Sequence, residues 1–80
     1  NEYSSLDFKM FPNPVSGNYL NIKTNQVLKI GVYDVLGKLI MATKVDSNNS
    51  KIDVSQLKKG IYLIKLDSDK GSNTKKLIKQ

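Results

Sequence analysis

The 80-residue sequence contains no cysteine, histidine or tryptophan, and all 13 of its basic residues are lysine. Without cysteine the chain has neither disulfide bonds nor thiolate metal ligands. Without histidine it lacks the commonest general base and transition-metal ligand near neutral pH. Because specific nucleic-acid sites draw heavily on arginine, the lysine-only composition also predicts no nucleic-acid partner.

The acidic residues offer little for catalysis. The seven acids are Glu2, Asp7, Asp34, Asp46, Asp53, Asp67 and Asp69. They are scattered, and an 80-residue chain has little material for the cleft that paired carboxylates need. No serine lies in the glycine-rich turn of a nucleophile elbow. We therefore expect no catalytic residues and no enzyme activity.

The stretch "DSDKGSN" matches a calcium-binding loop only in part. Asp67 and Asp69 have the first spacing of such a loop, but the twelfth position is Ile78 instead of a bidentate acid. We interpret the stretch as a wide, solvated hairpin loop, and we expect no metal site and no cofactor.

The charge and the apolar runs limit the partners further. The net charge is +6, and the lysines are spread along residues 9–79, which is typical of a solvated surface and compatible with attraction to an anionic one. No apolar run approaches the roughly 20 residues of a membrane helix, so we expect no transmembrane segment. Because the sequence begins with Asn1 instead of methionine, we expect it to be part of a longer protein.

Apolar residues recur with a period of two, which is typical of half-buried strands. The predicted strands are residues 8–11, 19–23, 28–33, 39–45, 52–54, 61–66 and 74–80. This spacing predicts an all-β fold, a small immunoglobulin-like β-sandwich of about seven short antiparallel strands. A five- or six-stranded barrel is the alternative.

The pattern also predicts which side chains lie in the core. Residues 61–66 look apolar on both faces, so we expect a central, well-buried strand. Leu57 is expected to fill the core from a turn. Of the aromatic residues, we expect Phe11, Tyr33 and Tyr62 in the core, whereas Tyr19 could be exposed.

Four motifs in a fixed order carry a family resemblance: "FKMFPNPVSGNYLNI", "IGVYDVLGKLI", "IDVSQLKKGIYLIKL" and "KKLIKQ". Together they resemble the type A C-terminal sorting domain of the type IX (Por) secretion system of Bacteroidetes. The resemblance covers residues 8–80, and it makes residues 1–7 a polar linker from an upstream cargo protein. It implies a secretion signal that directs the attached cargo to the outer-membrane translocon.

The resemblance also implies partners and a location. The partners are the type IX outer-membrane machinery, its sorting peptidase, which removes the domain afterwards, and the cargo in the same chain. The domain would pass through the periplasm as a monomer, and its cargo would reach the cell surface or the extracellular space.

The motif residues divide into two groups. The sorting-motif residues, structural or recognised, are Pro12, Asn13, Pro14, Gly37, Leu57, Gly60 and Tyr62. The terminal recognition candidates are Lys75, Lys76, Leu77, Ile78 and Lys79. We expect the proline bend to contact nothing, and we expect Gly60 and Tyr62 to serve folding. The terminal strand is expected at a sheet edge, where unpaired backbone groups accept another chain or lysines guard against aggregation.

Two other functions remain open from the residues alone. The first is a carbohydrate- or surface-binding accessory module of a secreted enzyme, since β-sandwiches often have this role. The second is a fibronectin-like spacer between other domains.

Overall fold

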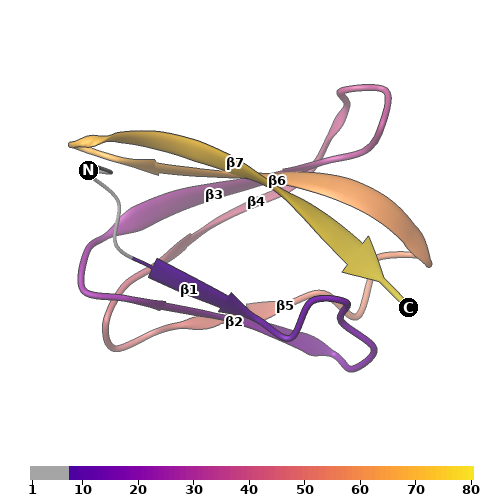
Figure 1. The fold of residues 1–80 in the computed structure, drawn as a ribbon, viewed down its shortest axis with the longest axis horizontal. Helices are drawn as coiled ribbons and strands as arrows, with labels where there is room; N and C mark the ends of the chain where they lie inside the picture. The colour runs from indigo at the N-terminus through magenta and orange to yellow at the C-terminus, as the bar shows by residue number, and fades with distance from the viewer. Residues whose placement is uncertain (1–7) are drawn as a thin grey trace.

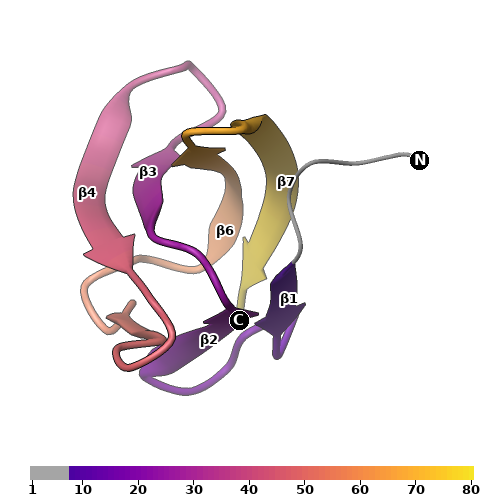
Figure 2. The ribbon, with the colours of Figure 1, turned by 90° about the vertical axis from the view of Figure 1, so that its left-hand side faces the viewer.

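The computed structural model describes residues 8–80 as two antiparallel sheets that pack face to face (Figure 1). The strands are β1 (Phe8–Phe11), β2 (Tyr19–Thr24), β3 (Leu28–Tyr33), β4 (Leu39–Val45), β5 (Lys51–Asp53), β6 (Gly60–Ser68) and β7 (Gly71–Lys79). One sheet has the order β1-β2-β5 and the other β4-β3-β6-β7, and the larger sheet lies above the smaller one in Figure 2. The predicted all-β sandwich is confirmed.

Alternation along the strands explains why these segments pair. In β2, Leu20 and Ile22 are buried, while Tyr19 and Lys23 on the opposite side are exposed. Successive side chains of a strand point to opposite faces, so a period of two places every second residue between the sheets. The opposite face of each sheet is exposed to solvent.

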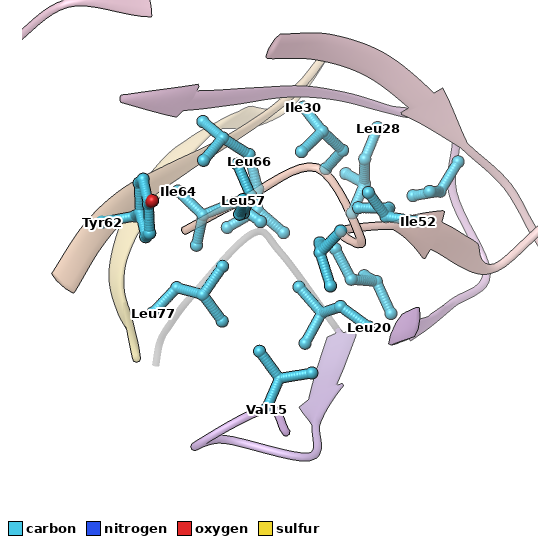
Figure 3. Close-up of a cluster of buried hydrophobic side chains, with 14 residues drawn as sticks. Val15, Leu20, Leu28, Ile30, Ile52, Leu57, Tyr62, Ile64, Leu66 and Leu77 are labelled. Carbon is cyan, nitrogen blue, oxygen red and sulfur yellow. The ribbon is translucent and has the colours of Figure 1, made fainter. Parts of the chain in front are cut away.

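The core lies between the two sheets and draws on every strand except β1, and on two loops. Figure 3 shows Val15 and Leu57, both from loops, among the strand side chains. Its members are Val15, Leu20, Ile22, Leu28, Ile30, Val32, Val45, Ile52, Val54, Leu57, Tyr62, Ile64, Leu66 and Leu77. Leu57 is 6% exposed, so the prediction that it fills the core from a turn is confirmed. Each fully buried aliphatic side chain contributes about 1.5–3 kcal/mol to folding.

The strand β6 departs from its expected burial. It lies inside the four-stranded sheet, as predicted, but only Tyr62, Ile64 and Leu66 are buried. Ile61 and Leu63, on its other face, are 49% and 41% exposed. The expectation of burial on both faces was wrong because, within residues 8–80, the second sheet covers only one side.

Two aromatic residues and one loop also differ from expectation. Phe11 is 48% exposed and Tyr33 is half-buried, since both lie on outward strand faces. The predicted wide loop after β6 is instead a tight turn, because β6 continues through Ser68 and β7 begins at Gly71. The Ser68 hydroxyl accepts a hydrogen bond from the Lys70 N–H and stabilises this turn.

The hairpin between β3 and β4 stands away from the sandwich, above the four-stranded sheet (Figures 1 and 2). Gly37 has a φ of 87°, a left-handed conformation that other residues adopt at a cost. The Asp34 carboxylate accepts hydrogen bonds from the N–H groups of Leu36 and Lys38, both at 2.9 Å. These contacts hold a short loop that exposes its apolar residues.

Candidate recognition site at the terminal strand

The Pro-Asn-Pro bend is bound to the last strand. After β1 ends at Phe11, the Asn13 side-chain amide donates a hydrogen bond to the Lys76 carbonyl at 2.9 Å. Its oxygen accepts one from the Ile78 N–H at 3.1 Å. The expectation that this bend contacts nothing was wrong, because one amide side chain satisfies two backbone groups on the edge of β7.

The backbone of Val15 continues this pairing. Its N–H donates to the Ile78 carbonyl, and its carbonyl accepts from the Gln80 N–H, both at 2.8 Å. This forms a parallel bridge with Lys79, and the Val15 side chain is fully buried. The segment therefore covers the end of β7 as a one-residue strand and also contributes to the core.

Lys79 completes the contact between the two ends of the described chain. Its ammonium group donates a hydrogen bond to the Gly17 carbonyl at 2.9 Å, and the residue is only 9% exposed. The aliphatic stem packs while the charge finds an oxygen, as lysine side chains can do. Lys79 is therefore a structural residue in this fold.

We call this arrangement the latch. Its members are Asn13, Val15 and Gly17 on one side and Lys76, Ile78, Lys79 and Gln80 on the other. The strand β7 does lie at the edge of its sheet, as predicted. The expectation of unpaired backbone groups at its end was wrong, because the latch occupies those of Ile78.

The five terminal candidates consequently differ in what they present. Leu77 is fully buried in the core and Ile78 is half-buried. Lys75 and Lys76 are exposed, as are Pro12 and Pro14 in the bend beside them. The exposed side chains of the site thus include two prolines and two lysines, on either side of the hydrogen bonds from Asn13.

An electrostatic contact links the latch to the smaller sheet. Hydrogen bonds from the Ser55 side chain and backbone lower the pKa of the exposed Asp53 carboxyl, and the positive charge of Lys79 lowers it further. Asp53 is at the end of β5, where it accepts the Ser55 N–H at 2.9 Å. This carboxylate therefore stays ionised at neutral pH and contributes to the turn that follows β5.

The segment "LKKGIY" includes the turn before β6 and the first three residues of that strand. The Leu57 N–H donates to the Val54 carbonyl at 3.0 Å, and the Tyr62 hydroxyl donates to the Lys58 carbonyl at 2.7 Å. Gly60 has a φ of 153°, and an added Cβ there would meet no atom within 4 Å. The cost of replacing this glycine is thus conformational, and all three motif residues have a clear role in folding.

The sequence did not identify Val15, Gly17 or Gln80 as site residues. Val15 offered one signal, an apolar residue that follows a proline in a polar turn. The other two contribute only backbone atoms, which no residue pattern reveals. Gly37, also a motif residue, lies in the β3–β4 hairpin and not in the latch.

Other kinds of site have little to support them within residues 8–80. No group of three metal-ligating side chains gathers there, and no helix there is long and apolar enough to span a membrane. A hollow at the end of the larger sheet has no aromatic ring in its lining, which consists of three lysines, two aspartates, Gln26, Val27 and Ser68. The half-exposed Tyr19 ring has the Lys51 ammonium 5.6 Å from its centroid.

This chain is similar to one family of domains and to parts of two larger enzymes. Residues 9–80 match the family described as "Secretion system C-terminal sorting domain". The chain is 37% identical over 82 residues to an endo-acting ulvan lyase of Formosa agariphila, which covers 98% of this chain and 16% of that protein. It is 33% identical over 70 residues to β-agarase D of Zobellia galactanivorans, covering 88% of this chain and 14% of that protein. The chain thus spans less than a fifth of the length of either relative.

Proposed function

Because this chain belongs to the secretion system C-terminal sorting domain family, we propose that the type IX machinery reads it as a folded domain whose recognition surface is held by the latch. The family's role is sorting, so the chain is a secretion signal for an attached protein destined for the cell surface or the extracellular space. The catalytic activities named for the two relatives are those of the whole enzymes, of which this chain matches less than a fifth.

The observation that carries the proposal is the pair of hydrogen bonds from Asn13. They join the Pro-Asn-Pro motif to the terminal lysine motif across 63 and 65 residues of sequence. Two motifs that look independent in the sequence are therefore one structural unit. This favours a surface that exists only in the folded domain over a linear signal.

The exposed lysines are the proposed contact points. Lys75 and Lys76 are solvent-accessible on an edge strand, whereas Leu77 and Lys79 are buried on either side of the half-buried Ile78. A charged contact at an exposed position gives specificity and speeds association. We assign recognition to Lys75 and Lys76 and positioning to the latch residues and to Pro12 and Pro14.

The arrangement of the whole protein belongs to the same proposal. Residues 8–80 are the sorting domain, and residues 1–7, which lie outside the described residues, are the linker to an upstream cargo. The sorting peptidase would cut within or before this linker, and the domain would act as a monomer.

A carbohydrate-binding role has weaker support. Phe11 and Tyr19 are half-exposed on the smaller sheet, but Lys51 already lies over the Tyr19 ring. A glycan platform normally offers flat aromatic surface that is free to stack. Binding of ulvan or agarose oligosaccharides by the isolated domain would favour this alternative.

An export assay tests the proposal. A periplasm-directed reporter is fused to residues 1–80 in a bacterium with a type IX system, with Lys75 and Lys76 both replaced by alanine. We expect export to fall about tenfold while the melting temperature is unchanged, since both side chains are exposed. The matched control replaces Lys9 and Lys23, an exposed pair on the smaller sheet, and should export normally. Full export of the folded Lys75→Ala, Lys76→Ala variant would contradict the proposal.

A further inference from the structure

The outer face of the four-stranded sheet is apolar at one end. Cross-strand register aligns Leu39 with Tyr33 and Tyr33 with Leu63, and in the next two strands Ile61 with Ile78. Leu39 is 51% exposed, Ile61 49% and Leu63 41%. Large side chains, aliphatic in three strands and the Tyr33 ring in β3, therefore adjoin one another on the side that faces away from the core.

The β3–β4 hairpin extends this surface. Val35 and Leu36 are 69% and 90% exposed, and Ile40 just after the hairpin is 42% exposed. Of nine large hydrophobic side chains exposed within residues 8–80, six lie in this region. We call them the apolar face: Val35, Leu36, Leu39, Ile40, Ile61 and Leu63. Single exposed hydrophobics are ordinary, whereas a contiguous group marks an interaction surface.

Lysines border the apolar face. Alternation and register place Lys65 and Lys76 beside Leu63 on the same side of the sheet, and Lys29 and Lys44 one position further from its apolar end. Asp67, paired with Lys29, is the acid that register places on this side among residues 8–80. The nearby Asp34 carboxylate already accepts two N–H groups of the hairpin. The surface is thus apolar in the centre and positive at its rim.

We propose that the apolar face is a docking surface for a protein partner that has an apolar centre and an acidic rim. The charge argues against a second copy of this chain, because a face-to-face pair would bring the lysine rims together. The shape argues against a flat lipid surface as the partner. The hairpin stands above the sheet at one side (Figures 1 and 2), so a flat surface that touches the hairpin would be held away from the sheet. The inference goes beyond the proposed function, which depends on Lys75, Lys76 and the latch.

Site-specific crosslinking in exporting cells provides the first test. A photoreactive amino acid replaces Leu63 in the reporter fusion that carries residues 1–80, and the control carries it at Lys23 on the outer face of the smaller sheet. We expect position 63 to crosslink to one protein, identified by mass spectrometry, and position 23 not to do so. Absence of a protein adduct at position 63, or the same adducts from both positions, would overturn the proposal.

Binding measurements with the purified crosslinked protein provide the second test. The double variant Leu36→Ser, Leu63→Thr removes apolar side chains that are exposed in the free domain, and we expect affinity to fall about tenfold or more. The variant Lys44→Glu, Lys65→Glu should slow association and reverse its salt dependence. The control Lys9→Glu, Lys23→Glu changes the net charge equally on the opposite side and should bind within about twofold of wild type.

Three further results would overturn the inference. The first is a crosslink from position 63 only to the domain itself, either to another copy or to its own chain. The second is sedimentation with anionic phospholipid vesicles that is lost in Leu36→Ser, Leu63→Thr. The third is undiminished binding of that variant while circular dichroism shows it folded. Lys76 lies opposite Leu63 on the same face of the sheet. The variants named above leave Lys75 and Lys76 unchanged, so failure of this inference is distinguished from failure of the proposed function, which is tested by Lys75→Ala, Lys76→Ala.

Discussion

Replacing Asn13 by alanine tests the latch directly. The change removes two hydrogen bonds, to the Lys76 carbonyl at 2.9 Å and from the Ile78 N–H at 3.1 Å. It touches no core side chain, since Asn13 is exposed. Any decrease in the free energy of unfolding therefore comes from the two hydrogen bonds and from the loop that they hold in place.

The size of the expected destabilisation follows from the fact that both hydrogen bonds are neutral and exposed to solvent. A neutral hydrogen bond contributes about 0.5–1.5 kcal/mol to the free energy of unfolding, and water replaces part of it at an exposed site. Two such bonds give about 1–2 kcal/mol. For a domain of this size, each kcal/mol lowers the melting temperature by about 4–8 °C. We expect Asn13→Ala to melt about 4–16 °C below the wild type.

Two measurements check this expectation. Thermal unfolding followed by circular dichroism gives the melting temperature, and amide hydrogen exchange reports the Ile78 N–H, which should exchange faster in the variant. Asn25→Ala is the matched control, because Asn25 is an exposed turn asparagine with a negative φ. An unchanged melting temperature together with an equally protected Ile78 amide would refute the reasoning.

Three further predictions concern neighbouring parts of the fold. Gly60→Ala should lower the free energy of unfolding by about 1–3 kcal/mol because of the positive φ at this position, as measured by urea unfolding. Gly17→Ala is the control and should change it very little, since Gly17 has open space around it and no positive φ. Equal losses in the two variants would contradict this prediction. Leu77→Ala should lower the free energy of unfolding by about 2–5 kcal/mol, and a loss under about 1 kcal/mol would show that Leu77 is not core. Because the pKa of Asp53 is lowered, its ionised form stabilises the fold above its ordinary pKa, and this contribution is lost as pH falls through the folded value. The Asp53→Asn variant should thus lose less of its free energy of unfolding than the wild type as the pH falls below about 4. If the two proteins showed the same dependence of stability on pH, that would count against the Ser55 contacts.

The alternation of apolar residues was sufficient to predict the seven strands and the sandwich. Burial on one face imposes a period of two, and that period is visible in a single sequence. It failed for β6, where Ile61 and Leu63 are apolar but exposed. A local pattern records that a side chain is apolar, and it cannot record whether the domain itself covers it.

The latch was beyond sequence reasoning for a different reason. Asn13 finds its partners 63 and 65 residues away, and they are backbone groups that every residue type carries. Lys79 looked like an exposed charge, yet its stem packs and its ammonium reaches the Gly17 carbonyl. Partners this far apart in the chain are set by topology, which follows from the whole fold.

The long reach of the latch bears on when the domain is able to fold. Residues 13–15 obtain their partners only after residues 76–80 have been synthesised, and β7 also supplies Leu77 to the core. Contacts of such high sequence separation make folding slow compared with local hairpin formation. A ribosome that stops short of the last strand therefore leaves the four-stranded sheet incomplete and the Pro-Asn-Pro bend without its partners. The fold therefore forms only in chains that contain the last strand, and a receptor that reads the fold selects those chains.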